Sequence, residues 1–153
     1  MDAQSGHLVE AYVDGACIPR NPSGIPVWGF LLLRDHTPLE TRGGLAGAES
    51  SPKATNNVAE YEAFINALKQ IKRLGWDQDK IVVYTDSRIV RNQLKDEWKA
   101  KPALLPWYKK AKALMNGFSY FELRWIPGNQ NRVADRAAKV AYYEARLAQL
   151  KKK

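Results

Sequence analysis

The spacing of apolar residues changes from strand-like to helical near the middle of the chain, and this change restricts the fold more than any other feature. Before it, residues 8–16, 28–33 and 39–47 have the character of short strands, with a proline-rich turn over residues 19–26. After it, residues 58–74 place apolar side chains at helical spacing. The three strands are therefore expected to form an antiparallel meander that leads into a helix.

Helices and strands alternate in the second half of the chain. We predict a strand over 81–85, a helix over 87–97, a helix over 103–116 that breaks near Pro106, a strand over 120–126 and a closing helix over 136–150. Strands that are joined by helices usually pair in parallel. The order β-β-β-α-β-α-α-β-α predicts an α/β fold with a five-stranded mixed sheet flanked by helices.

Size and charge limit the classes of function. The 153 residues fit one domain, 1–153, with an ordered core over about 8–147 and a basic tail at 151–153. The net charge of +8 favours a polyanionic partner. No apolar run approaches the ~20 residues of a membrane span, and the single cysteine, Cys17, fits a reducing compartment. We expect a cytoplasmic monomer without membrane contact.

Four carboxylates lie at predicted element edges in this otherwise basic chain. Asp14 lies at the end of the first predicted strand in Y-V-D-G-A-C, and Asp86 follows the fourth strand in V-Y-T-D-S. Glu60, in T-N-N-V-A-E-Y, is in phase with the apolar side of the helix at 58–74, where a carboxylate needs a partner. Asp135, in N-R-V-A-D-R, immediately precedes the closing helix. Strand ends and helix starts of this kind can converge in one pocket.

Each of these acids also has a purely structural interpretation. Glu60 fits the third position of a capping box with Asn57 as N-cap. Asp86 and Asp135 each fit a helix cap, and the Asp-Gly pair at Asp14 is common in turns. Taken one at a time, these alternatives stay open.

The acids gain a common explanation if they meet. Four anions in one pocket repel one another unless cations neutralise them. Oxygen ligands favour Mg²⁺ or Mn²⁺ over zinc, and neither His7 nor His36 has the spacing of a zinc ligand. The sequence contains no G-x-x-x-x-G-K-[ST] phosphate loop and no G-x-S-x-G nucleophile turn. It therefore favours metal-dependent chemistry on a polyanion.

The four motifs, in this order, resemble those of the ribonuclease H type 1 family over about residues 8–147. The resemblance implies the ribonuclease H-like fold and an endonuclease that hydrolyses the RNA strand of RNA–DNA hybrids. It also implies two Mg²⁺ ions and products with 5′-phosphate and 3′-hydroxyl ends. By that resemblance Asp14 bridges both ions and Asp135 completes one of them. Glu60 and Asp86 complete the other, and Glu60 lies near a 2′-hydroxyl of the RNA.

The same resemblance implies nucleic-acid contacts for polar residues around the acids. Thr55 matches the family residue that holds a DNA phosphate, and Asn56 and Asn57 match a pair that contacts the minor groove. The remaining expected contacts are Asn21, Cys17, Ser87, Trp98, Lys99 and Lys101. For Asn57, the role of N-cap remains open beside this one.

The loop before the last aspartate departs from the family pattern. Well-studied bacterial members carry a histidine there, whereas residues 127–132 contain none. The candidates to replace it are Asn129, Gln130, Asn131 and Arg132. Because the carboxylates are the centre of the two-metal scheme, we expect activity to persist without the histidine.

A long basic insertion that those members carry after the Asp86 unit is also missing, as in shorter archaeal and bacterial forms. Grip on the DNA strand is then expected from Trp98 and the lysines Lys99, Lys101, Lys109, Lys110 and Lys112. The alternative is that Trp107 belongs to the core and the lysines form a solvated face.

Two other classes of function compete with a hybrid-specific ribonuclease. A resolvase or integrase of the same fold keeps an acid cluster but lacks T-N-N-x-x-E, and a ribonuclease H module of a reverse transcriptase is closer kin. A non-catalytic hybrid-binding module would not need all four acids. Cleavage of a labelled hybrid separates these alternatives.

Overall fold

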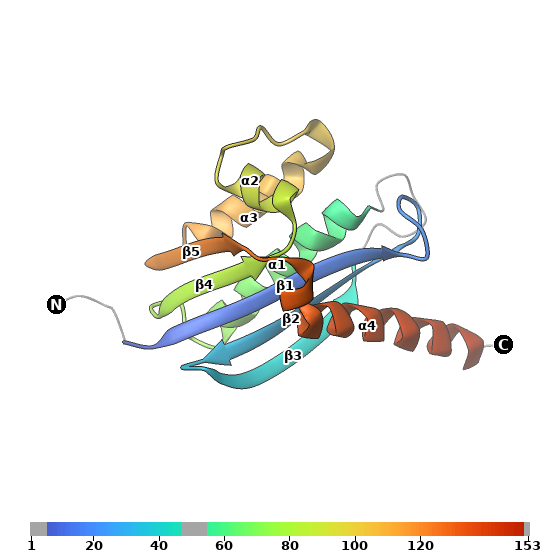
Figure 1. The fold of residues 1–153 in the computed structure, drawn as a ribbon, viewed down its shortest axis with the longest axis horizontal. Helices are drawn as coiled ribbons and strands as arrows, with labels where there is room; N and C mark the ends of the chain where they lie inside the picture. Colours follow the sequence, from blue (N-terminus) through green and yellow to red (C-terminus); the bar gives the residue numbers. More distant parts are fainter. Residues whose placement is uncertain (1–5, 47–54, 152–153) are drawn as a thin grey trace.

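The computed structural model describes residues 6–46 and 55–151, which form a five-stranded sheet with helices on both faces (Figure 1). Its strands are β1 Leu8–Ile18, β2 Ile25–Arg34, β3 Thr37–Leu45, β4 Lys80–Thr85 and β5 Tyr120–Trp125. The strand order is β3-β2-β1-β4-β5. β1–β2 and β2–β3 pair antiparallel, whereas β1–β4 and β4–β5 pair in parallel. The predicted α/β mixed sheet is confirmed.

The helices are α1 Asn56–Arg73, α2 Arg88–Leu94, α3 Leu105–Met115 and α4 Arg132–Lys151, with 3-10 turns at Pro102–Leu104 and Gly128–Gln130. α1 and α3 pack together on one face of the sheet, and α4 crosses β2 and β3 on the other (Figure 1). Over the described ranges, none of the helices combines the length and the apolar character needed to cross a membrane.

The main core lies between β1 and α1. Val9, Ala11 and Val13 alternate along β1 and are fully or almost fully buried, as expected for one covered face of a strand. Phe64 and Ile71 of α1 are also buried in this cluster. The helix ends where the sequence predicts, because Gly75 takes a positive φ of 79° that favours glycine.

α4 approaches the sheet so closely that a side chain is excluded beneath it. A Cβ added at Gly43 of β3 would lie 2.2 Å from the Ala137 carbonyl oxygen. The helix presents small buried residues at this contact, Ala134, Ala137 and Ala138. Backbone therefore packs on backbone, and this fixes the start of α4 over the sheet.

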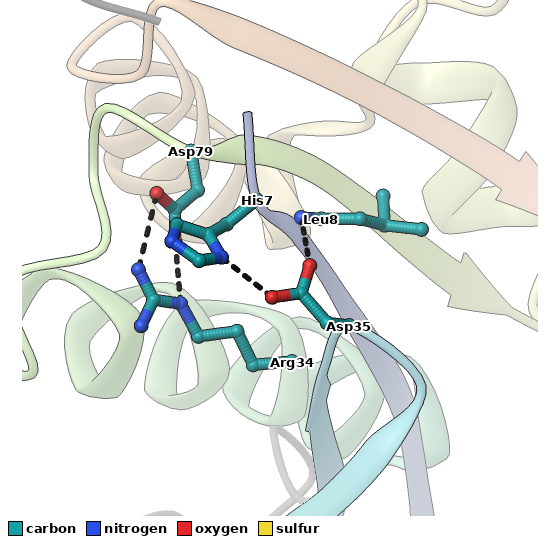
Figure 2. A network of polar contacts seen from close by, with 5 residues as sticks. All are labelled: His7, Leu8, Arg34, Asp35 and Asp79. Carbon is teal, nitrogen blue, oxygen red and sulfur yellow. Dashed lines mark hydrogen bonds and ion pairs between the residues drawn. The ribbon is translucent and has the colours of Figure 1, made fainter. Parts of the chain in front are cut away.

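A polar network at the amino end of β4 ties three segments together (Figure 2). Asp79, which is 2% exposed, accepts hydrogen bonds from Arg34 Nε at 2.9 Å and from Arg34 Nη2 at 3.5 Å. Asp35 accepts from the Leu8 N–H at 2.9 Å and lies 2.5 Å from His7 Nδ1. The network joins the turn between β2 and β3 to the starts of β1 and β4.

Several predicted boundaries of the strands were wrong. β1 and β2 continue as a hairpin to Ile18 and Ile25, so the predicted turn over 19–26 is shorter. β3 begins at Thr37, because Asp35 and His36 with positive φ values form a tight turn after β2. It ends at Leu45, and the predicted end at residue 47 lies outside the described residues.

The predicted helix boundaries also need correction. α2 is shorter than 87–97 because its last residue is Leu94. Pro106 lies in the first turn of α3, where a missing N–H is tolerated, and does not break the helix. α4 begins four residues before the predicted 136 and continues to Lys151, so Lys151 is helical; residues 152–153 of the predicted tail lie outside the described part.

Candidate active site

Asp14 lies inside β1, whereas the sequence predicted it at the end of the strand. The strand continues past it because Asp14 pairs with Gly29 and the ladder runs on to Ile18. The Asp14 side chain is 7% exposed. The Asp-Gly pair therefore belongs to a strand, and its interpretation as a turn is wrong.

Glu60 reaches this strand from the first turns of α1. Its Oε1 accepts a short hydrogen bond from the Gly15 N–H, and its side chain is 7% exposed. A Cβ at Gly15 would lie 2.3 Å from the Ala59 carbonyl carbon, so only glycine lets α1 approach this closely. Gly15 is a functional position that the sequence-based reasoning missed, although glycine inside a strand is a signal of close backbone approach.

The alternative interpretation of Glu60 as a member of a capping box is wrong. Thr55, not Asn57, is the N-cap of α1, and its Oγ1 accepts from the Val58 N–H at 3.2 Å. Glu60 does not return to the cap, since its carboxylate points to Gly15. Asn57 is thus a residue of the first helical turn, and the buried acid has no capping role.

Asp86 follows β4 directly at its carboxyl end, as predicted. Ser87 alone caps α2, through a hydrogen bond from the Val90 N–H to Ser87 Oγ at 3.1 Å. Asp86 Oδ2 instead accepts from Asn131 Nδ2 at 3.3 Å, and its backbone oxygen accepts from Trp125 Nε1 at 3.0 Å. The side chain is therefore held by the loop before α4, and the shared cap is wrong.

Asp135 lies within the first turn of α4, because the helix begins at Arg132 and the Asp135 N–H donates to the Asn131 oxygen at 3.1 Å. The prediction that it precedes the helix was wrong. Its Oδ2 lies 2.9 Å from Lys139 Nζ. The charge of Asp135 also helps to raise the pKa of Asp14, so the two carboxyl groups lie near each other. The fourth acid thus lies near Asp14 and pairs with a lysine of its own helix.

The structure brings three of the four acids into one small cluster. Asp14, Glu60 and Asp86 each offer a carboxylate oxygen, and these atoms lie within 4.8 Å of one another. Burial, with added repulsion from Asp86 and Asp135, raises the pKa of Asp14 to about 8. Burial and the Asp14 charge likewise raise the pKa of Glu60 well above its ordinary value. Within residues 6–46 and 55–151, no cationic side chain forms an ion pair with these three acids.

This donor set fits a hard divalent cation. Carboxylate oxygens from β1, from α1 and from the residue after β4 converge, and burial and neighbouring negative charge raise the pKa values of Asp14 and Glu60. Mg²⁺ and Mn²⁺ favour oxygen ligands, whereas the cluster offers no nitrogen or sulfur ligand. Asp135 is not part of this group of three but lies near Asp14, whose pKa its charge helps to raise.

The asparagines predicted to contact nucleic acid lie together beside the N-terminus of α1. Asn21 Nδ2 donates to Asn56 Oδ1 at 2.8 Å, and the Asn56 N–H donates back to Asn21 Oδ1 at 3.0 Å. Thr55 and Asn57 flank Asn56 along the chain, at the positive end of the helix dipole. Cys17 is half-buried in β1, and burial raises the pKa of its thiol, which fits a packing residue.

The aromatic and basic segment after α2 surrounds a separate cavity. Trp98, which is 51% exposed, lines a space of about 840 Å³ with Lys99 and Lys101. Lys112 is instead engaged by Asp96 Oδ2 at 2.8 Å. Lys109 and Lys110 are exposed on α3.

Trp107 follows its structural interpretation. It packs against the core, and its Nε1 donates to Glu62 Oε2 at 2.8 Å. Glu62 of α1 is partly buried by this contact. Both residues belong to the interface between α1 and α3 rather than to a binding surface.

The loop candidates for the missing histidine separate into two groups. Asn129, Gln130 and Arg132 are exposed, whereas Asn131 is 1% exposed. Asn131 Nδ2 also donates to the Val13 oxygen at 2.7 Å, while its Oδ1 is buried without a hydrogen-bond partner within the part of the chain that the structure describes. Asn131 is therefore the one of the four whose contacts reach the acid cluster.

Comparison with known families places the chain. Residues 29–141 match the family described as Reverse transcriptase-like. Ribonuclease HI of Halobacterium salinarum is 33% identical over 141 residues, which cover 92% of this chain and 67% of that protein. The bifunctional protein Rv2228c of Mycobacterium tuberculosis is 39% identical over 87 residues. The match covers 56% of this chain but only 23% of the length of Rv2228c.

Solved structures give the same relation. The crystal structure of RNase H1 from Halobacterium salinarum matches with a TM-score of 0.79 and 31% identity, over 90% of this chain and 98% of that chain. LC11-RNase H1, solved in complex with an RNA/DNA hybrid, matches with a TM-score of 0.78 and 25% identity, over 90% and 98% of the two chains. The likeness therefore extends over nearly the whole sheet and its helices.

Proposed function

The chain belongs to the Reverse transcriptase-like family and is related to type 1 ribonucleases H, and on this premise we propose that it hydrolyses the RNA strand of RNA–DNA hybrids. The observation that carries the proposal is the convergence of Asp14, Glu60 and Asp86 within 4.8 Å, without a basic partner among the described residues. A cluster of this kind is costly unless it serves cation-dependent chemistry. The known complex of LC11-RNase H1 with an RNA/DNA hybrid supports the substrate.

In this proposal the four acids hold two Mg²⁺ ions, for which Mn²⁺ substitutes. The ions supply charge neutralisation at the entering and leaving oxygens of an in-line displacement that gives 5′-phosphate and 3′-hydroxyl ends. Asp14 is central to the site, because its carboxylate is close to those of Glu60, Asp86 and Asp135. Gly15 holds Glu60 and Asn131 holds Asp86, so both carboxylates are oriented before substrate binds.

The substrate is gripped by residues on two sides of the cluster. Thr55, Asn56 and Asn57, with Asn21 beside them, contact phosphate and the minor groove at the start of α1. Cys17 and Ser87 lie near the cleaved strand. The cavity at Trp98, Lys99 and Lys101 contributes stacking and phosphate contacts to the DNA strand.

A cleavage assay tests the proposal. The chain should cut the RNA strand of an end-labelled hybrid with Mg²⁺ or Mn²⁺, and should leave duplex DNA and single-stranded RNA intact. Chelation of the cation should stop cutting. Hybrid binding without cutting would favour the non-catalytic module, and cutting of DNA junctions would favour a resolvase.

The DNA-strand contacts have their own test. Lys99→Ala and Lys101→Ala should each weaken hybrid binding and lower the salt slope by about 1 if each meets one phosphate. Lys112→Ala serves as the control, since Asp96 already engages that lysine. An unchanged salt slope would indicate that Lys99 and Lys101 are solvated and do not contact phosphate.

We further propose that the protein is a monomer of the cytoplasm. The single cysteine of the sequence supports a reducing compartment. Light scattering across a concentration series tests the oligomeric state.

A further inference from the structure

A cavity of about 550 Å³ lies between α2 and β5, next to the acid cluster but separate from the residues already assigned to substrate. We call it the β5-edge pocket, and its lining is Arg88, Arg91, Asn92, Lys95, Leu123, Arg124 and Trp125. Four of these side chains are cationic, and no carboxylate takes part in the lining. Figure 1 shows α2 close to β4 and β5.

Ion pairs neutralise only two of the four cations. Arg91 Nη1 lies 2.8 Å from Glu97 Oε1, and Arg124 pairs with Glu122. Arg88 and Lys95 are exposed and form no ion pair with any described residue. The pocket therefore keeps positive charge available for an anionic ligand.

An aromatic platform completes the pocket and links it to the acid cluster. The Arg88 guanidinium lies 4.5 Å from the centre of the Trp125 ring, and Trp125 is 37% exposed. The same Trp125 donates from Nε1 to the Asp86 backbone oxygen at 3.0 Å. A flat cationic stack thus begins directly beside a residue of the cluster. Nucleic-acid strands are bound by this combination of stacking surface and phosphate-binding cations.

We propose that the β5-edge pocket binds the RNA strand on one side of the cut bond, with a backbone phosphate at Arg88 and Lys95 and a base against the Arg88–Trp125 stack. This inference rests on the proposed function. The RNA strand is assigned because the pocket adjoins Asp86, and in the proposal Asp86 acts at the cleaved bond. The assigned DNA contacts, by contrast, lie at α1 and at the Trp98 cavity.

The test removes the two available charges together. In an Asp14→Asn background, which prevents cleavage, Arg88→Gln with Lys95→Gln is compared with Lys72→Gln with Arg146→Gln. The control pair loses one lysine and one arginine from exposed positions on α1 and α4. Binding of a fluorescent short hybrid is measured against salt, either blunt or with an RNA or a DNA overhang at each end.

The proposal predicts that an RNA overhang at one end strengthens binding, and that the Arg88/Lys95 pair of substitutions removes this gain. It also predicts a salt slope lower by about 1 and a five- to tenfold weaker Kd near about 0.1 M salt on that probe, beyond the change in the control. Arg88→Lys alone should keep the slope and lose part of the gain, because it keeps the charge without the flat stack.

Three outcomes would overturn the assignment. These are an unchanged slope, a change equal to that of the control, and an equal gain from DNA and RNA overhangs. Thermal unfolding of each variant confirms that it is folded before binding is compared. Because the binding assay does not depend on cleavage, loss of hybrid cutting in the unsubstituted protein would refute the proposed function and leave the pocket result readable.

Discussion

β4 carries an aspartate at each end, and the fold treats the two in opposite ways. Asp79, before the strand, is buried and receives both hydrogen bonds of the Arg34 guanidinium (Figure 2). Asp86, after the strand, joins Asp14 and Glu60 within 4.8 Å without a cationic partner among residues 6–46 and 55–151. The acid at the amino end of β4 is thus paired with a cationic side chain of the protein, whereas the acids at its carboxyl end have no such partner among the described residues.

The neighbouring acids repeat this contrast. At the Asp79 end, the Leu8 N–H and then His7 lower the pKa of Asp35. At the Asp86 end, burial and like charges raise the pKa of Asp14 to about 8. Acids that only stabilise a fold are given donors, whereas acids that serve a reaction can be left strained.

The largest expected effect is from Asp14→Asn. Cleavage of a labelled hybrid should fall by at least about a thousandfold, because several kcal/mol of cation-dependent stabilisation are lost. The melting temperature without divalent cation should stay level or rise, since one source of repulsion is gone. Retained cleavage would contradict the central place of Asp14, and a large fall in melting temperature would contradict the strain.

Asp79→Asn should do the reverse. Loss of a buried partner leaves Arg34 uncompensated, which should lower the free energy of unfolding by about 3 kcal/mol. This value is at the low end for buried pairs because the Arg34 side chain is 29% exposed. Urea unfolding measures the loss, and cleavage per folded molecule should stay within about twofold. A stronger effect on cleavage than on stability would break the comparison.

Without divalent cation, stability should fall as pH rises from about 4 to about 8. In this window the folded chain binds more protons than the unfolded chain, because the pKa of Asp14 is about 8 when folded and 3.8 ordinarily. Each such group contributes at most about 1.4 kcal/mol per pH unit. Urea unfolding in a pH series should show the slope, and Asp14→Asn or added Mg²⁺ should flatten it. A free energy of unfolding that does not change with pH in the unsubstituted chain would refute this prediction.

The smallest effect is expected from Asn131→Ala. Asn131 orients Asp86 and touches the Val13 oxygen, so its loss should lower kcat by about five- to tenfold, near 1 kcal/mol, with little change in KM. Asn129→Ala is the matched control, since Asn129 is exposed in the same loop. Equal effects of the two substitutions would remove Asn131 from a positioning role.

Much of the fold could be predicted from the sequence because local patterns and tertiary contacts agree. The helical phase of α1, its end at Gly75 and the position of Asp86 after β4 all followed from spacing. Boundaries failed where tertiary pairing extended an element. Asp14 lies inside β1 because the β1–β2 ladder continues beyond it, and such pairing leaves no local trace.

The contacts within the site could be predicted from the sequence less completely than the fold. The four acids were identified by their motifs and Asn131 was among the loop candidates, but the contacts made by Gly15 and Trp125 were not predicted, since they join distant segments. Gly15 to Glu60 spans 45 residues, and Trp125 to Asp86 spans 39. Lys139, beside Asp135, was also missed, although its position one helical turn later was a usable signal.

The contact between Gly15 and Glu60 makes catalytic activity depend on the position of α1 on the sheet. Because a backbone amide of the sheet holds a carboxylate from the helix, a molecule whose helix has slid along the sheet loses the reactive geometry while staying compact and helical. During refolding, the recovery of cleavage activity should consequently be slower than the recovery of the helical circular dichroism signal. The difference between the two times would measure how long α1 takes to dock on the sheet.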